Sequence, residues 1–240
     1  MAAAFSGGRG RVPLRIMAIF EKSERLRHIG HLDLMRATQR ALRRSGLPIG
    51  YSKGFTPHVQ VAFASALATG AWGSRELMDV QLAEGAAVTP EEFVSAMNRA
   101  LPPEMQISEA KILPDRTPGL MSLVQAAEYD LTLPEGEEKQ TMRAALPGFL
   151  AQESIAAQRK TKSGMKEVDI RPFIHLLEEN ENGLHALLRL TEGESCKPDM
   201  LLTALAAFCG LETVPVCRVR RLGLYGRNEQ GELKPLEELV

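Results

Sequence analysis

The chain has 240 residues, of which 44% are apolar and 25% are charged. These fractions are typical of a globular protein, and no apolar run is long enough to span a bilayer. The three cysteines are odd in number and unevenly spaced, so they are expected to be reduced core or near-core thiols rather than disulfides or metal ligands. The Gly- and Arg-containing N-terminus lacks the apolar core of a signal peptide, which favours a cytoplasmic protein.

The net charge of −1 conceals a strong asymmetry along the chain. Residues 9–60 contain eleven lysines and arginines against three acids, whereas residues 74–150 contain six against thirteen. A near-neutral chain with one basic segment indicates an anionic partner that binds at one place, more than non-specific binding to polyanions. Charge fluctuates along any chain, but here four of the basic residues share one expected helix.

In chain order, the first half alternates strands and helices. Gly46 is in position for a left-handed helix C-cap, and Pro48 then prevents the helix from continuing. Thr89-Pro90-Glu91-Glu92 has the pattern of a capping box with proline at the first helical position. Strands are predicted at residues 14–22, 59–64, 76–84 and 105–113, and helices at 30–45 and 89–101.

The second half has the same predicted order after a turn-rich connector. Strands are predicted at 127–133, within 154–177 as strand–turn–strand, at 183–191 and at 214–225, and helices at 135–152, interrupted at Pro147-Gly148, and at 198–208. This order is that of the ferredoxin-like unit, so the fold class is predicted as α+β, with two tandem ferredoxin-like (βαββαβ) domains. The expected boundaries are a flexible basic tail at 1–12, domain 1 at 13–113, a linker at 114–124, domain 2 at 125–225 and a C-terminal tail at 226–240.

The first helix is expected to carry a basic stripe beside its apolar side. Leu34, Met35, Ala41 and Leu42 fall on one side of this helix and are expected to pack on a sheet. The stripe lies at positions i, i+4, i+7 and i+8 and consists of Arg36, Arg40, Arg43 and Arg44. Like charges four residues apart are mildly destabilising, and phosphate groups would relieve that repulsion. A solvated helix face is the usual alternative.

The turn at residues 50–58 alternates aromatic and basic side chains between glycines. Tyr51 and Phe55 could stack on unpaired bases while Lys53 holds a phosphate. An equally weighted alternative is that both rings cap the edge of the core.

Three residues of the same region are candidates for chemistry. His31, Asp33 and His58 would share a proton or a metal if the loops before and after the helix met at one end of the sheet. No HExxH or paired CxxC motif accompanies them, so no metal site is predicted. His31 and His58 remain candidates for general acid–base catalysis.

A second basic cluster surrounds an expected hairpin tip at Ser163-Gly164. It contains Arg159, Lys160, Lys162 and Lys166, and Arg218, Arg220 and Arg221 add charge to the last strand. Such tips are usually only solvated, although the composition also suits phosphates. The chain has no Walker A loop, no nucleophile elbow and no CxxxCxxC, so it does not itself hold a radical-SAM iron–sulfur cluster.

The stretch HIGHLDLMRATQRALRRSGLPIGYSKGFTPHVQVAFASALATG, residues 28–70, resembles the signature of the radical-SAM-linked domain family of bacteria, whose function is not established. LMSLVQAAEYDLTL, KEVDIRPFI and RVRRLGLY are similar to later blocks of that family, so the resemblance spans about 14–225. It implies a radical-SAM protein as partner, which would hold the iron–sulfur cluster and SAM, so no cofactor is expected in this chain. It also implies a setting in RNA metabolism. This chain has Gly30 where the family pattern has serine, so the case for a hydroxyl nucleophile at this position is weakened. It also has Thr56 where the pattern has asparagine.

Three functions are weighed from these observations. The first is an RNA-binding accessory protein that works with a radical-SAM partner in tRNA or rRNA modification or processing. The second is a metal-independent endoribonuclease in which His31 or His58 deprotonates a 2′-hydroxyl and Lys53 or an arginine stabilises the developing charge. The third is a protein–protein adaptor without RNA contact. By fold analogy alone, the second is similar to CRISPR repeat-processing endoribonucleases.

Overall fold

The computed structural model describes residues 13–161 and 164–240, so the expected basic tail at 1–12 and Lys162 lie outside the described residues. The α+β class predicted from the sequence is confirmed. The first half contains β1 (Arg15–Lys22), η1 (Glu24–Leu26), α1 (His31–Arg44), β2 (Val61–Phe63), β3 (Ala71–Gln81), α2 (Pro90–Ala100) and β4 (Ile107–Ile112). The second contains α3 (Leu120–Leu123), β5 (Ala126–Thr132), α4 (Glu137–Leu150), β6 (Ala156–Thr161), β7 (Gly164–Asp169), η2 (Arg171–Phe173), β8 (Ile174–Asn180), β9 (Gly183–Arg189), α5 (Pro198–Phe208), β10 (Arg218–Arg227), β11 (Leu233–Pro235) and α6 (Leu236–Leu239).

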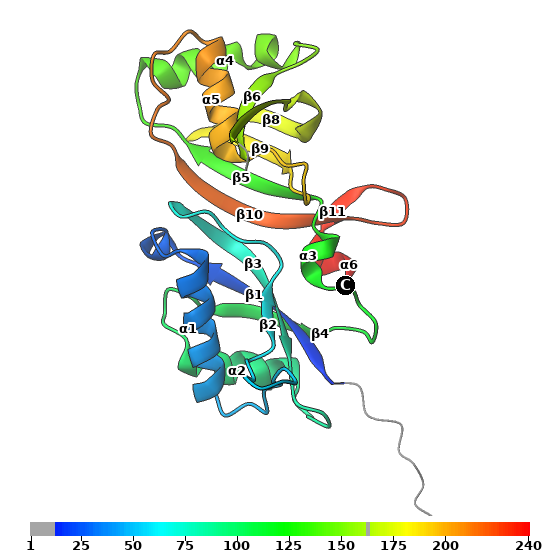
Figure 1. Cartoon of the computed structure of the whole chain (residues 1–240). Helices are drawn as coiled ribbons and strands as arrows, with labels where there is room; N and C mark the ends of the chain where they lie inside the picture. The colour runs from blue at the N-terminus through cyan, green and yellow to red at the C-terminus, as the bar shows by residue number, and fades with distance from the viewer. Residues whose placement is uncertain (1–12, 162–163) are drawn as a thin grey trace, which may run out of the picture.

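Nine of the described strands form one sheet with the order β4-β1-β3-β10-β5-β9-β8, and β2 pairs with β3 while β11 pairs with β10. The two halves meet where Val219–Arg221 of β10 runs parallel to Ala71–Gly73 of β3, and the other pairings in this sheet are antiparallel. The β6-β7 hairpin forms a separate two-stranded sheet. Figure 1 shows α1 and α2 with the first half and α4 and α5 with the second, with β10 running between them.

Helix α1 begins and ends where the sequence pattern predicted. Its buried side chains are Leu34, Thr38, Ala41 and Leu42. They pack in an apolar cluster with Phe20, Phe63 and Phe93, which lies between the sheet of the first half and helices α1 and α2. Because this face is buried, the arginines on the other side of α1 are left in solvent.

Helix α2 begins at the predicted capping box. The Thr89 hydroxyl accepts a hydrogen bond from the Glu92 amide at 3.2 Å, and the Thr89 amide donates to the Glu92 carboxylate at 2.9 Å. Replacing Thr89 with alanine is therefore expected to lower the free energy of unfolding by about 1 kcal/mol. Urea denaturation of both proteins measures this difference, and a change below the error of the measurement would contradict it.

The structure corrects the predicted interruption of the helix at Pro147-Gly148, because α4 continues to Leu150. Pro147 lies in the last turn and removes one hydrogen bond, to the Arg143 carbonyl, near the end of the helix. The side chain of Phe149 is fully buried, with its ring 5.6 Å from that of Phe208. This packing holds the last turn in helical conformation.

The segments expected to be a linker and a C-terminal tail are both structured. Leu120 of α3 and Leu236 of α6 are buried in the larger apolar cluster, which also contains side chains of β1, β3, β5 and β9. Arg75 Nε donates to Glu237 at 2.9 Å, which fixes α6 against β3. These elements cover the face of the first-half sheet that lies away from α1 and α2.

Candidate functional site

The basic stripe of α1 is exposed along its whole length. Arg36 pairs with Asp33 at 3.1 Å, and Arg44 Nη2 donates to the Ala100 carbonyl at 2.8 Å. Arg40 and Arg43 have no ion pair or hydrogen bond with any residue that the structure describes. Arg40 follows Arg36 by four residues, and Arg43 follows Arg40 by three. The stripe from Arg36 to Arg43 is therefore roughly 10 Å long. The carboxylates of the acidic segment 74–150 do not neutralise the stripe within the described part of the chain.

The turn at 50–58 is a short hairpin that projects from the sheet. Tyr51 and Val59 form an isolated β-bridge, and the Ser52 amide donates to the His58 carbonyl at 2.9 Å. Gly50 passes so close to β3 that an added Cβ would lie 2.8 Å from the Gln81 carbonyl oxygen, so only glycine fits there. The hairpin tip is therefore fixed at its base while its side chains extend into solvent.

The aromatic rings of this hairpin differ in exposure. Phe55 is fully exposed at 110% and Tyr51 is 46% exposed. Phe55 therefore does not cap the core edge, which was one of the two predicted roles. Lys53 is also exposed and has no hydrogen-bond partner among the described residues. A cation beside exposed rings is the arrangement that stacks unpaired bases in single-stranded RNA.

The two predicted catalytic histidines are not brought together. His31 is the first residue of α1, and its ring packs edge-on against Phe63 with 5.6 Å between ring centroids. The His58 Nδ1 instead lies 2.7 Å from the Ser52 hydroxyl in the hairpin. His31 and His58 therefore contact different side chains, and no hydrogen bond among the described residues joins them. A shared proton or metal between these imidazoles has no support in this geometry.

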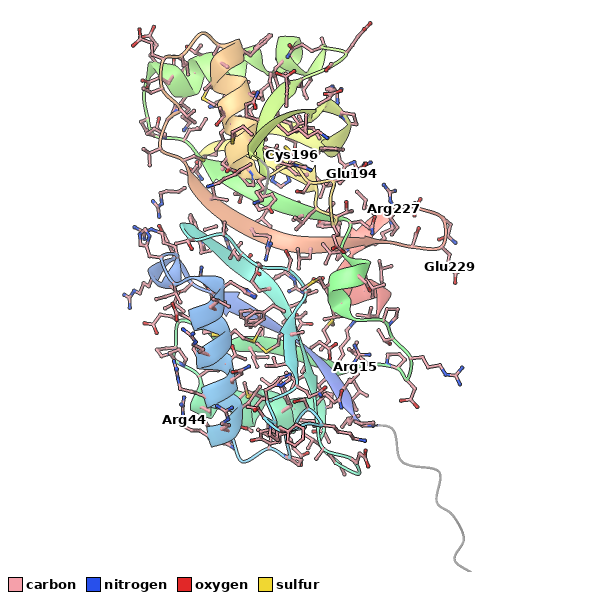
Figure 2. The ribbon with its side chains drawn as sticks, in the orientation of Figure 1. Arg15, Arg44, Glu194, Cys196, Arg227 and Glu229 are labelled. Atoms are coloured by element: carbon pink, nitrogen blue, oxygen red, sulfur yellow. The ribbon has the colours of Figure 1, made fainter. Side chains whose placement is uncertain are left out.

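The second basic cluster lies in the other half of the molecule. Arg159 donates to the carbonyls of Gly193 and Ser195, and Lys160 is exposed. Both line a cleft of about 410 Å³ with Lys197, which sequence reasoning missed because it lies 28 positions beyond Asp169, the end of the hairpin. Figure 2 shows Glu194 and Cys196, which flank Ser195, far from Arg44 at the lower end of α1. The two basic clusters therefore do not form one continuous groove.

Arg221, expected to add surface charge to the last strand, is instead buried where the two halves meet. Its guanidinium donates to Glu76 Oε1 at 2.8 Å and to the Ser65 carbonyl at 3.2 Å. Although burial acts to lower the pKa of Arg221, the Glu76 carboxylate raises it above its usual value. Arg218 and Arg220 remain exposed, with Arg218 paired to Glu24.

Lys22 is a second buried cation at this junction. Its ammonium donates to the carbonyls of Ile29 and Ala71 at 3.0 Å each, and weakly to Arg27 at 3.4 Å. Burial lowers the pKa of Lys22, and the Glu76 carboxylate partly opposes this. Alternation along β1 places Lys22 on the face of Phe20, so the sequence contained a signal for its burial. Through these bonds Lys22 fixes the turn that leads into α1.

The cysteines and the possible metal ligands do not form a reactive site in the described part of the chain. The three cysteines are free, and burial raises the pKa of Cys196 and of Cys217 to about 12, as expected of core or near-core thiols. Within residues 13–161 and 164–240, no group of three His, Cys, Asp or Glu side chains is arranged to hold a metal. No helix in that part of the chain is both long and apolar enough to cross a bilayer.

Comparison with known proteins adds one finding. A bacterial family described as an uncharacterized protein conserved in bacteria, DUF2344, matches residues 15–199, which is well over half of the chain. The match includes the α1 stripe, the hairpin at 50–58 and the basic cleft of the second half. A search of curated proteins finds no match.

Proposed function

This chain belongs to the bacterial DUF2344 family, and we propose that it is an RNA-binding accessory protein that presents tRNA or rRNA to a partner enzyme. The observation that carries the proposal is the pair of exposed arginines, Arg40 and Arg43, which have no acidic partner among the described residues. Guanidinium groups suit phosphate geometry, and a rigid helix holds them at fixed spacing.

The hairpin at 50–58 supports RNA over other polyanions. Phe55 presents a fully exposed ring near the exposed Lys53, and such a ring can stack on an unpaired base. The bases of loops and single strands offer flat apolar faces to such a ring, whereas regular duplex DNA keeps its bases stacked inside. Heparin-like polyanions offer charge without any base to stack on. Single-stranded regions of structured RNA are therefore the proposed ligand.

Replacing Phe55 with alanine is expected to weaken RNA binding by roughly 1–3 kcal/mol, because one base loses its stacking partner. The free energy of unfolding should not change, since the ring contacts no core side chain. Fluorescence anisotropy with a labelled tRNA fragment measures the affinity, and Phe55→Tyr, which keeps a stacking ring, serves as the control. Equal affinity for wild type and the alanine variant would show that Phe55 does not stack on RNA.

The general test of RNA binding is a salt series. Binding through phosphates releases counterions, so the logarithm of the association constant should fall linearly with the logarithm of salt concentration. Affinity that is independent of salt, or absent for every tRNA and rRNA fragment tested, would overturn the proposal. Sequencing RNA crosslinked to the protein in cells would identify the ligand.

The proposed partner enzyme is a radical-SAM protein. This part of the proposal rests on the resemblance of residues 28–70 to the radical-SAM-linked signature, and the partner would supply the iron–sulfur cluster and SAM. A pull-down that persists after nuclease treatment would separate direct protein contact from RNA bridging. If the partner is retained but no RNA binds, the protein is an adaptor. The endoribonuclease alternative needs only one of His31 and His58 as the base, and incubation of labelled tRNA and rRNA fragments with the protein in EDTA tests it.

We also infer that the halves are tandem ferredoxin-like units. The strand order is β4-β1-β3-β2 in the first half and β10-β5-β9-β8 in the second, each with two helices in the βαββαβ order. The β6-β7 hairpin would then be an insertion after α4. This symmetry supports the boundaries expected near residues 113 and 125, with the C-terminal β11 and α6 added to the second unit.

A further inference from the structure

A cleft of about 780 Å³ lies between the two halves, away from the α1 stripe. Its walls come from three segments of the chain, which are residues 64–66 after β2, residues 119–125 around α3 and residues 190–192 after β9. Clefts that bind small molecules have volumes of roughly 300–1,000 Å³ and often lie between domains. This one is large enough for a nucleotide-sized group.

The walls of the cleft are mostly apolar. Ala64 and Val124 are buried side chains of the large apolar cluster, and Leu190 packs against it. Met121 is exposed, and its flexible thioether can adapt to a flat aromatic ring. None of the described lysines and arginines lines the cleft, so its ligand is not expected to be held by phosphate contacts.

The backbone around the cleft is fixed by hydrogen bonds. Arg221 donates to the carbonyls of Ser65 and Ala66 at 3.2 and 3.4 Å, while it is paired with Glu76. On the opposite wall, the Gln125 amide donates to the Tyr225 carbonyl at 2.7 Å, and the Leu190 amide donates to the Gln125 carbonyl at 2.9 Å. The cleft is therefore preformed.

Two polar side chains that line the cleft are free to bind a ligand, since Gln125 is half-buried and Glu192 is exposed. The side-chain amide of Gln125 and the carboxylate of Glu192 have no hydrogen-bond or ion-pair partner in the part of the chain that the structure describes. The hydroxyls of Ser122 and Thr191 donate to the carbonyls of Gly119 and Glu194, each at 2.7 Å, and keep their acceptor lone pairs. The cleft thus combines apolar walls with one amide and several acceptors.

We propose that this cleft binds a single unstacked nucleobase with an exocyclic amino group, adenine in particular. The inference rests on the proposed RNA-binding function and names the base-recognition site within it. A glutamine amide can pair with adenine through one donor and one acceptor, and the Glu192 carboxylate accepts from an exocyclic amine. The sugar and phosphate stay outside, where the absence of basic lining residues is no disadvantage.

The position of the cleft along the chain connects it with the basic stripe. Residues 64–70 run from the cleft wall to the turn before α1, where the Gly70 amide donates to the Arg27 carbonyl at 2.7 Å. Six residues extended span roughly 20 Å at most. Arg40 and Arg43 lie roughly 14–18 Å further along α1 from that turn. A single strand of RNA several nucleotides long must therefore pass around the turn to contact the stripe and place a base in the cleft.

The test uses AMP, CMP, UMP and GMP as separate probes with the full chain, because single nucleotides need no contact with the stripe. Isothermal titration is expected to show AMP binding more tightly than UMP, and Gln125→Ala should weaken AMP binding roughly 30-fold, the effect of losing both hydrogen bonds of the bidentate pair. Ala66→Trp should block the cleft. Gln140→Ala on the exposed side of α4 is the matched control and should bind AMP like wild type.

The outcomes separate this inference from the proposed function. If Arg40→Gln combined with Arg43→Gln loses RNA affinity but keeps AMP binding, the RNA-binding function and the assignment of the cleft are both supported. If AMP binds and no RNA does, the cleft is a nucleotide site and the RNA-binding function is wrong. If RNA binds with the expected salt dependence but no nucleotide binds at millimolar concentration, the cleft assignment is wrong. AMP binding that is unchanged by both Gln125→Ala and Ala66→Trp also overturns it.

Discussion

Replacing Arg40 and Arg43 together with glutamine is expected to weaken RNA binding roughly 100-fold at low salt. Each charged hydrogen bond to a phosphate contributes roughly 1.5 kcal/mol or more, and two are lost. The slope of the logarithm of affinity against the logarithm of salt should decrease in magnitude by about 1.4, since each phosphate contact on a single strand contributes about 0.7. Anisotropy titrations between low and physiological salt measure both quantities.

The control for this prediction must remove the same charge elsewhere on the surface. Arg116 and Arg227 are exposed and lie away from α1, in the connector before α3 and at the end of β10. Their double replacement with glutamine should leave both affinity and slope near wild type. All these side chains are exposed, so unfolding free energies should agree within about 0.5 kcal/mol. Equal losses in the two double variants would show that net charge, and not the α1 stripe, governs binding.

The helices that carry the candidate site could be predicted because their signals are local. Gly46 and the Thr89 capping box mark helix ends through backbone conformation and hydrogen bonds within a few residues. The exposure of Arg40 and Arg43 follows from the 3.6-residue period once the apolar side of the helix is buried. By contrast, the interruption of α4 at Pro147-Gly148 was wrongly predicted, because the burial of Phe149 depends on α5, which is distant in sequence.

Arg221 shows why the junction could not be predicted. Arg218 and Arg220 are exposed, and simple alternation places Arg221 on the opposite face of β10, but the sequence does not say whether that face is covered. The register also shifts between Arg221 and Gly223, where a bulge changes which residues face the core. The parallel pairing of β3 with β10 joins segments about 150 residues apart, roughly the separation of Gly73 and Arg221. No local pattern specifies such a pairing.

Replacing Glu76 with glutamine is expected to lower the free energy of unfolding by about 3–5 kcal/mol. Glu76 is the carboxylate partner of buried Arg221 and the nearest negative charge to buried Lys22. Without it, two cations remain in the interior with only neutral acceptors, and an uncompensated buried charge is strongly destabilising. Urea denaturation at neutral pH measures the change. The same variant should weaken AMP binding, because Arg221 would no longer hold residues 64–66 in place.

Two controls test whether an uncompensated buried charge causes the expected loss of stability in Glu76→Gln. Arg143 and Glu179 form a pair of similar length, 2.8 Å, but Glu179 is 61% exposed, so Glu179→Gln should cost less than about 1 kcal/mol. Glu76→Leu combined with Arg221→Met removes both charges and should recover much of the stability lost in Glu76→Gln, since apolar groups can replace a buried pair. If Glu76→Gln costs no more than Glu179→Gln, the ion pair does not hold the halves together, and the apolar contacts of Leu224 and Val124 must do so. Recovery in the double variant, in contrast, would show that the stability lost in Glu76→Gln comes from the uncompensated buried charge of Arg221.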